Sequence, residues 1–297
     1  MKKIAFINDL CGFGRCSLTA AIPVISTMGI EACPLPTAIL SAQTGFPSYY
    51  CDDYTDRMNY FTDEWSKMNV TFDGIYSGYL ANPSQIAQVK YFLDRFQKED
   101  TLYLVDPVMG DHGQKYPFFT EELLAGMREL ASRATVITPN LTEACLLAGV
   151  SYDDLYAHRY EEDYLLRIQD VAFTLLEKNG STQTPLCDLQ SSNLSIPSKI
   201  VLITGILQED ADGAFVTNLA VSNEECACTS TSYTGISFSG TGDLFASAIC
   251  GYLVNGVPLQ EAMDKAVDFL QPAIEEATNT GIPRDFGIPF QKYLSRL

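Results

Sequence analysis

Short apolar runs alternate with longer segments of helical periodicity along most of the 297-residue chain. Runs of about four to eight apolar residues are typical of buried parallel strands, and an apolar repeat of about three to four residues is typical of helices. The predicted strands occupy residues 2–7, 31–40, 74–80, 101–108, 134–138 and 199–205. The predicted helices occupy residues 17–28, 58–69, 83–96, 121–131, 162–178 and 259–278, with further helices after Asn140 and Gly240.

Strands and helices alternate, which predicts an α/β protein with a mainly parallel, doubly wound sheet and helices on both faces. Residues 214–220 and 226–233 are predicted to form an antiparallel pair, because only a short polar turn separates them. Residues 151–198 carry the weakest pattern, and their polar part, 180–198, is expected to be a surface loop in a local insertion. Since no repeat or linker divides the chain, we expect one domain over residues 1–297.

Composition narrows the possible classes of function. The net charge of −18, without any basic stretch, argues against nucleic-acid binding, because little would neutralise the phosphates. No apolar run is long enough to span a bilayer, and the polar pair Asn8-Asp9 interrupts the first run too early for a signal peptide. The 9 cysteines lack metal-type spacing, which predicts reduced thiols in a cytoplasmic protein.

Polar loops follow four of the predicted strands. They span residues 8–17, 41–47, 106–111 and 138–143. Doubly wound sheets bind ligands at the carboxyl ends of their strands, so these loops are candidate ligand sites. The first loop contains two closely spaced glycines, but Ser17 stands where a dinucleotide-binding motif has its third glycine. A loop whose backbone a small ligand can approach is therefore favoured.

The strongest chemical pattern is Gly240-Thr241-Gly242-Asp243, directly before an apolar helix. Glycines let backbone N–H groups turn toward one point, and a helix start adds free donors and the positive end of the dipole. This arrangement suits a phosphate or a developing oxyanion. Asp243 is then either a charge at the helix N-terminus or a general base beside an anion site. The chain has no Walker A sequence and no protein-kinase motif set, so phosphate binding would fall to these residues.

Two other loops carry carboxylates that could have either a structural or a ligand-binding role. Asp106 follows a buried strand, where it either caps the next turn or serves a ligand. Asn140 and Glu143 have the spacing of a helix capping box, which explains both residues structurally and is compatible with a ligand role as well.

In this order and at these spacings, the motifs resemble the pyridoxal kinase (vitamin B6 kinase) branch of the ribokinase-like family. The segments that carry the resemblance are residues 11–17, 36–46, 78–80, 106–111, 138–140 with Glu143, 204–205 and 240–243. The resemblance implies a three-layer α/β/α sandwich and a homodimer. It also implies transfer of a phosphoryl group from ATP, with Mg²⁺, to the 5′-hydroxymethyl group of pyridoxal, pyridoxamine or pyridoxine.

The resemblance further implies roles for single residues. Asp243 would remove the proton of the substrate hydroxyl, and the backbone N–H groups of Gly240, Thr241 and Gly242 would stabilise the transferring phosphoryl group. The residues expected at the vitamer are Asn8, Gln43, Thr44 and Tyr79. Those expected at ATP are Asp106, Tyr116, Asn140, Glu143, Thr204 and Gly205. Mg²⁺ would lie at Asp106 and Glu143, in part through water.

Two departures from the family bear on the choice of vitamer. The family often has a serine where Asn8 or Asp9 falls, and a histidine where Gln43 stands. Gln43 can both donate and accept a hydrogen bond and is expected to face the ring substituent at position 4. The alternatives are a hydroxymethylpyrimidine kinase of the same family and a non-catalytic nucleotide- or vitamer-binding protein, and the intact Asp243 argues against the latter.

Overall fold

The computed structural model describes residues 1–177, 199–210 and 213–297, so the loop expected over residues 180–198 lies outside the described residues. The chain divides into two compact units. Unit 1 comprises residues 1–106 and 234–297, and unit 2 comprises residues 107–233. The expectation of one kinase domain over the whole chain stays a prediction. Among the described helices, none is long and apolar enough to cross a membrane.

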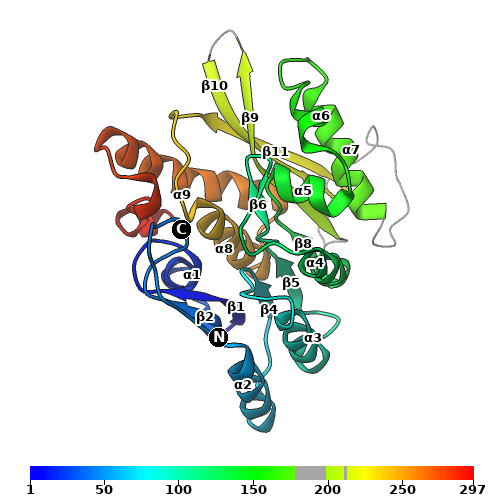
Figure 1. The fold of residues 1–297 in the computed structure, drawn as a ribbon, viewed down its shortest axis with the longest axis vertical. Helices are drawn as coiled ribbons and strands as arrows, with labels where there is room; N and C mark the ends of the chain where they lie inside the picture. The colour runs from blue at the N-terminus through cyan, green and yellow to red at the C-terminus, as the bar shows by residue number, and fades with distance from the viewer. Residues whose placement is uncertain (178–198, 211–212) are drawn as a thin grey trace. The chain divides into compact units, whose positions relative to one another are not determined.

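Unit 1 is built around strands in the order β5-β4-β1-β2-β3. These are β1 (Lys3–Cys11), β2 (Glu31–Leu40), β3 (Cys51–Asp53), β4 (Gly74–Ser77) and β5 (Leu102–Val105). β1 is parallel to both β2 and β4, β4 is parallel to β5, and β3 is antiparallel to β2. The first group of helices is α1 (Ser17–Thr27), α8 (Thr241–Val254) and α9 (Leu259–Asn279), and the second is α2 (Thr55–Lys67) and α3 (Gln85–Phe96). The two groups cover opposite faces of these strands (Figure 1).

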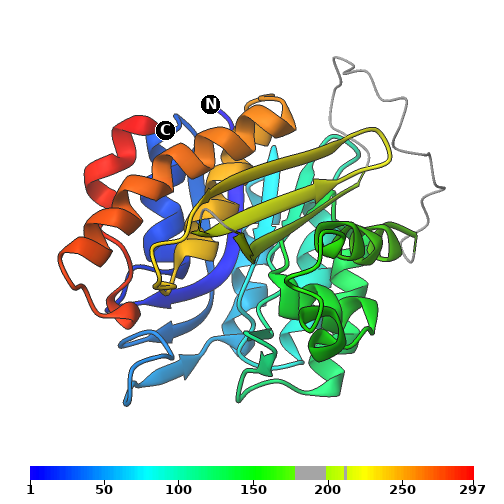
Figure 2. The same cartoon turned by 90° about the horizontal axis from the view of Figure 1, so that it is seen from above.

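Unit 2 has strands in the order β11-β10-β9-β8 and a separate hairpin of β6 and β7. The strands are β6 (Gly110–Asp111), β7 (Gln114–Lys115), β8 (Val136–Ile137), β9 (Ile200–Asp210), β10 (Gly213–Val221) and β11 (Cys226–Ser232). The helices are α4 (Glu121–Arg133), α5 (Leu141–Ala148), α6 (Tyr152–Tyr156) and α7 (Tyr164–Glu177). Figure 2 shows β9, β10 and β11 side by side, where their pairing is antiparallel.

The core of unit 1 follows from the apolar runs. Phe6 on β1, Tyr76 on β4 and Tyr103 on β5 are fully buried, as expected of strands covered on both faces. The phenol groups of such tyrosines need partners inside the protein, and Tyr103 Oη lies 2.8 Å from Ser77 Oγ. These large side chains hold the strands whose carboxyl ends carry the polar loops.

Most predicted elements are confirmed, including the bounds of β2 and the antiparallel pairing of β10 with β11. The strand predicted over residues 2–7 is too short, because β1 continues to Cys11. Its pairing with β2 shifts register between Asn8 and Leu10, so a bulge admits the polar residues that interrupt the apolar run. β3, the hairpin of β6 and β7, the 3₁₀ helices η2 (Arg284–Phe286) and η3 (Phe290–Arg296), and α6 were not predicted.

Candidate active site

The start of α8 in unit 1 has the geometry of an anion site. Gly240 caps the helix in the left-handed conformation, with φ +82°, and none of the described side chains caps this end. Thr241 Oγ1 donates to the carbonyl of Phe238, 2.9 Å away, and this end of the helix has no side-chain cap hydrogen bond. A Cβ atom built at Gly242 meets no described atom within 4 Å, so the space beside this turn is open. Free donors and an open approach suit an anionic group.

Asp243 is partly buried in the first turn of α8. Burial raises the pKa of its carboxyl group from 3.8 to about 7, and the negative charge of Asp106 adds to the rise. Asn8 Nδ2 donates to Asp243 Oδ1 over 3.3 Å, and the backbone N–H of Ser17 also interacts with this carboxylate. A carboxylate with a pKa near neutrality can take up and release a proton at working pH, as a general base must.

Asn8 lies beside Asp243. From the sequence, Asn8 was expected to contact the vitamer. Its Oδ1 atom accepts from the backbone N–H groups of Asp9, at 3.0 Å, and Tyr79, at 2.8 Å. Only 1% of Asn8 is exposed, so its amide orients Asp243 and the loop of Tyr79. A Cβ atom at Gly78 would come within 2.8 Å of this amide, which explains the glycine after β4.

Asp106 follows β5 and is buried in unit 1. Burial raises the pKa of its carboxyl group to about 6, and the hydrogen bond from Tyr76 counteracts part of this rise. Tyr76 Oη donates to Asp106 Oδ2 over 2.9 Å. The Asp106 carboxyl group thus has one hydroxyl donor and an unfavourable charge, the condition in which a cation would stabilise it.

The other residues expected at the vitamer differ in orientation. Thr44 is exposed on the loop after β2. Tyr79 is partly buried and packs on a cluster formed by Cys11, Cys16, Ala38 and Leu40. Gln43 is turned inward: its Nε2 atom donates to the carbonyl of Asp285 over 3.0 Å, and its Oε1 atom accepts from Gly45 N–H over 2.7 Å.

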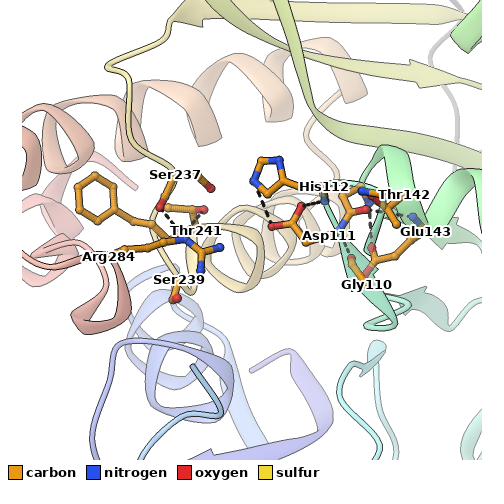
Figure 3. A network of polar contacts seen from close by, with 12 residues as sticks. Gly110, Asp111, His112, Thr142, Glu143, Ser237, Ser239, Thr241 and Arg284 are labelled. Carbon is orange, nitrogen blue, oxygen red and sulfur yellow. Dashed lines mark hydrogen bonds and ion pairs between the residues drawn. The ribbon is translucent and has the colours of Figure 1, made fainter. Parts of the chain in front are cut away.

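The residues expected at ATP, apart from Asp106, belong to unit 2. Asn140 and Glu143 form the predicted capping box: Asn140 Oδ1 accepts from Glu143 N–H at 3.0 Å, and Glu143 Oε2 accepts from Asn140 N–H at 2.9 Å. Glu143 Oε1 accepts from Met109 N–H over 3.1 Å, and Asn140 Nδ2 donates to the carbonyl of Gly110 over 2.8 Å. Figure 3 shows Glu143 and Thr142 beside Gly110.

Thr204, Gly205 and Tyr116 complete the expected nucleotide residues of unit 2. Thr204 pairs with Asn140 as an isolated parallel bridge, and its N–H donates to the carbonyl of Pro139 over 2.9 Å. Gly205 has φ +69° with no described atom within 4 Å of a Cβ built there. The ring of Tyr116 lies 5.7 Å from that of Phe118. The structure thus brings Asn140 and Thr204 together.

Asp9, Ser17 and Tyr76 were missed as site residues. Burial raises the pKa of Asp9, whose Oδ2 atom accepts from Cys11 Sγ over 3.0 Å and whose carboxyl group interacts with the Ser17 side chain. Ser17 has φ +50°, an uncommon conformation for a residue other than glycine. The interruption of the first apolar run was a signal for Asp9. The sequence carried no signal for Tyr76, because a tyrosine in a buried strand resembles any core aromatic residue.

The fold and the site define a small-molecule kinase of the ribokinase-like class, which confirms the predicted fold class and enzyme class. The sequence profile of the phosphomethylpyrimidine kinase family matches residues 18–185 and 168–285. The chain therefore belongs to this family.

Solved structures and curated relatives agree with this membership. A candidate phosphomethylpyrimidine kinase of Bacteroides thetaiotaomicron is 34% identical, with a TM-score of 0.85 over 99% of this chain and 92% of that one. One crystal form of that protein contains pyridoxal. The pyridoxal kinase of Lactobacillus plantarum, 24% identical, has the same fold, with a TM-score of 0.81 over 99% of this chain and 96% of that one.

The pyridoxal kinase PdxY of Rubrobacter xylanophilus is 24% identical over 94% of this chain and 89% of its own length. The alignment to one further curated pyridoxal kinase spans 56% of that protein. These relatives and the family profile confirm the family to which the sequence motifs pointed.

Proposed function

We propose that this protein transfers the γ-phosphoryl group of ATP to the 5′-hydroxymethyl group of pyridoxal, pyridoxamine and pyridoxine. The observation that carries the proposal is Asp243, a partly buried carboxyl group with a pKa of about 7 in the first turn of α8. It follows directly after the uncapped N–H groups at Gly240–Gly242. The names of the relatives and the pyridoxal in one of their crystals support the choice of substrate.

In this proposal, Asp243 removes the proton of the vitamer hydroxyl as that oxygen attacks the phosphorus. The N–H groups at the start of α8 stabilise the charge on the transferring phosphoryl oxygens. Asn8 holds the Asp243 carboxylate, while Thr44 and Tyr79 contact the pyridine ring. Tyr116, Asn140, Thr204 and Gly205 contact ATP.

Mg²⁺ is part of the proposal as well. The described residues contain no group of three or more metal-type side chains, which fits an ion held mainly by water and phosphate oxygens with one or two carboxylates. Asp106 would supply one carboxylate, and Glu143, whose two oxygens already accept backbone N–H groups, would act through water. Bound there, the ion would neutralise phosphate charge.

The direct test is ATP turnover with each B6 vitamer and with hydroxymethylpyrimidine, followed by ADP release. We expect turnover with the B6 vitamers. The family description favours hydroxymethylpyrimidine as a second candidate substrate, and turnover with it alone would replace our assignment. Binding without any ADP release would indicate a non-catalytic binding protein.

Activity is expected to increase with pH through about 7, the pKa of Asp243. The base must be deprotonated to accept the hydroxyl proton, so kcat/KM should fall about tenfold per pH unit below this value and level off above it. The measurement is kcat/KM for pyridoxine from pH 5 to 9, corrected for substrate ionisation. A profile without a transition between pH 6 and 8 would mean that Asp243 does not titrate as the base.

Asp106→Ala is expected to raise the Mg²⁺ concentration at half-maximal rate by about tenfold, because one proposed carboxylate for the ion is lost. Asp264→Ala, which removes an exposed carboxylate on α9 of unit 1, is the matched control. Unchanged metal dependence in Asp106→Ala would assign Asp106 to the structure of its turn.

We also propose that the protein acts in the cytoplasm as a homodimer. The cysteine pattern supports the first point, since none of the described cysteines forms a disulfide. The family resemblance supports the second. Sedimentation of the purified protein, with and without substrates, tests the dimer.

A further inference from the structure

We propose that Gln43 and Arg15 are positioning residues, which fix the anion-binding start of α8 through the segment of residues 283–287. Gln43 thereby has a role other than the ring contact expected from the sequence. The inference rests on the proposed function for its kinetic part only. All residues concerned belong to unit 1.

The 283–287 segment is bonded to the loop after β2 through Gln43. Gln43 Nε2 donates to the Asp285 carbonyl over 3.0 Å, and Gln43 Oε1 accepts from Gly45 N–H over 2.7 Å. The backbone N–H of Gln43 donates to the carbonyl of Phe13 over 3.1 Å. Only 8% of Gln43 is exposed, and both its amide nitrogen and its amide oxygen form hydrogen bonds with other groups of the protein.

The same segment is bonded to residues 237–239, directly before the anion site. Ser239 N–H donates to the carbonyl of Arg284 over 3.2 Å, and Arg284 Nε donates to the carbonyl of Ser237 over 3.1 Å. Figure 3 shows Arg284 beside Ser237 and Ser239. Gln43 Nε2 also lies 3.4 Å from Ser239 Oγ, so one amide contacts both the segment and the residue before Gly240.

Arg15 joins the glycine-containing loop after β1 to the same 283–287 segment. Its Nη1 atom donates to the carbonyls of Phe286, at 3.2 Å, and Gly287, at 3.0 Å. The backbones are packed closely: a Cβ atom at Gly240 would lie 2.0 Å from the Arg15 carbonyl oxygen, and one at Gly287 would lie 3.0 Å from the Ser239 carbonyl oxygen. A shift of Arg15 is therefore transmitted to Gly240.

Three phenylalanine rings, one from each joined element, pack against one another. The ring centroids of Phe13 and Phe286 are 5.2 Å apart, those of Phe13 and Phe46 are 5.4 Å apart, and those of Phe46 and Phe286 are 5.5 Å apart. Aromatic contacts at such distances are favourable, so the rings add to the hydrogen bonds that join these elements.

These contacts matter for catalysis because the donors at the start of α8 are backbone groups. Only the conformation of the flanking loops determines where such N–H groups point. Phosphoryl transfer depends on positioning, and a displacement of about 1 Å can reduce the rate about 10²-fold. Gln43 and Arg15 supply side-chain bonds that hold these loops together.

The kinetic test compares Gln43→Ala and Arg15→Met with the wild-type enzyme. We expect kcat to fall at least about tenfold in both variants, equally for pyridoxal, pyridoxamine and pyridoxine, while the KM for ATP changes less than about twofold. Gln43→His should recover most of the rate, because an imidazole also offers one donor and one acceptor. Gln291→Ala, an exposed glutamine of η3, is the matched control and should keep wild-type rates.

If Gln43 is a ring ligand instead, Gln43→Ala should raise the KM for one vitamer more than for the others, and Arg15→Met should have wild-type kinetics. Either result would overturn the proposal. Amide hydrogen exchange in the substrate-free protein gives a test that needs no activity. We expect faster exchange at residues 237–243 in Gln43→Ala and Arg15→Met than in Gln291→Ala, and equal exchange would refute the positioning role. An inactive wild-type enzyme would refute the proposed function alone.

Discussion

Replacing Asp243 by asparagine is expected to lower kcat by a factor of about 10² to 10⁴, with ATP binding retained. An amide cannot take the proton from the vitamer hydroxyl, but its oxygen can still accept the hydrogen bond that Asn8 Nδ2 donates to Asp243 Oδ1. The thermal unfolding midpoint should be unchanged or higher, because the substitution removes the charge repulsion between Asp243 and Asp106.

Three measurements separate this expectation from a merely structural role. They are steady-state kinetics with pyridoxal, calorimetric ATP binding and thermal unfolding. Asp264→Asn is the matched control, because Asp264 is an exposed carboxylate on α9 whose side chain contacts Gln260. Turnover of Asp243→Asn within a few-fold of the wild type would reduce Asp243 to a favourable charge at a helix N-terminus.

Gly240→Ala is expected to lower the free energy of unfolding by about 2 kcal/mol or more and kcat/KM by about 10²-fold. Gly240 has φ +82°, which strains any residue with a Cβ atom, and that atom would lie 2.0 Å from the Arg15 carbonyl oxygen. The backbone must move to relieve this clash. The N–H groups that follow Gly240 move with it, so activity and stability should fall together.

Gly242→Ala is the control for Gly240→Ala, because it also replaces a glycine but introduces no clash. A Cβ atom at Gly242 meets no described atom within 4 Å, and this glycine has no positive φ, so the free energy of unfolding should change by less than about 1 kcal/mol. Chemical denaturation of both variants provides the comparison. Equal unfolding midpoints for Gly240→Ala and the wild type would show that the loop accommodates a side chain, against the geometry of the structure.

Several site features could be predicted from the sequence because their physical cause is local. The capping box of Asn140 and Glu143 depends on two residues three positions apart, and the structure contains it. Gly240–Gly242 precede an apolar repeat, and α8 begins at Thr241. The family membership followed from such local motifs in a fixed order.

The side-chain amides of Asn8 and Gln43 show what local sequence patterns could not predict. Asn8 and Gln43 lie in polar segments that the sequence singled out as candidate ligand sites, and both were expected to face the vitamer. The structure shows Asn8 in contact with Asp243, 235 residues away, and Gln43 in contact with Asp285, 242 residues away, while their place at the vitamer stays a prediction. An amide offers the same donor and acceptor to a ligand or to the protein, so only its neighbours in space decide which one it binds.

The sequence by itself determined the α/β class, most helices and strands, the family and the chemical types of the site residues, because periodicity and short motifs act over a few neighbouring positions. The tertiary structure decided the pKa of Asp243, which depends on burial and on the charge of Asp106 from another strand end. It also decided the bulge that lets β1 continue to Cys11 and the contacts of Arg15 with the 283–287 segment. Burial, electrostatic interaction and hydrogen bonding between remote segments depend on distances in space, which only the folded chain defines.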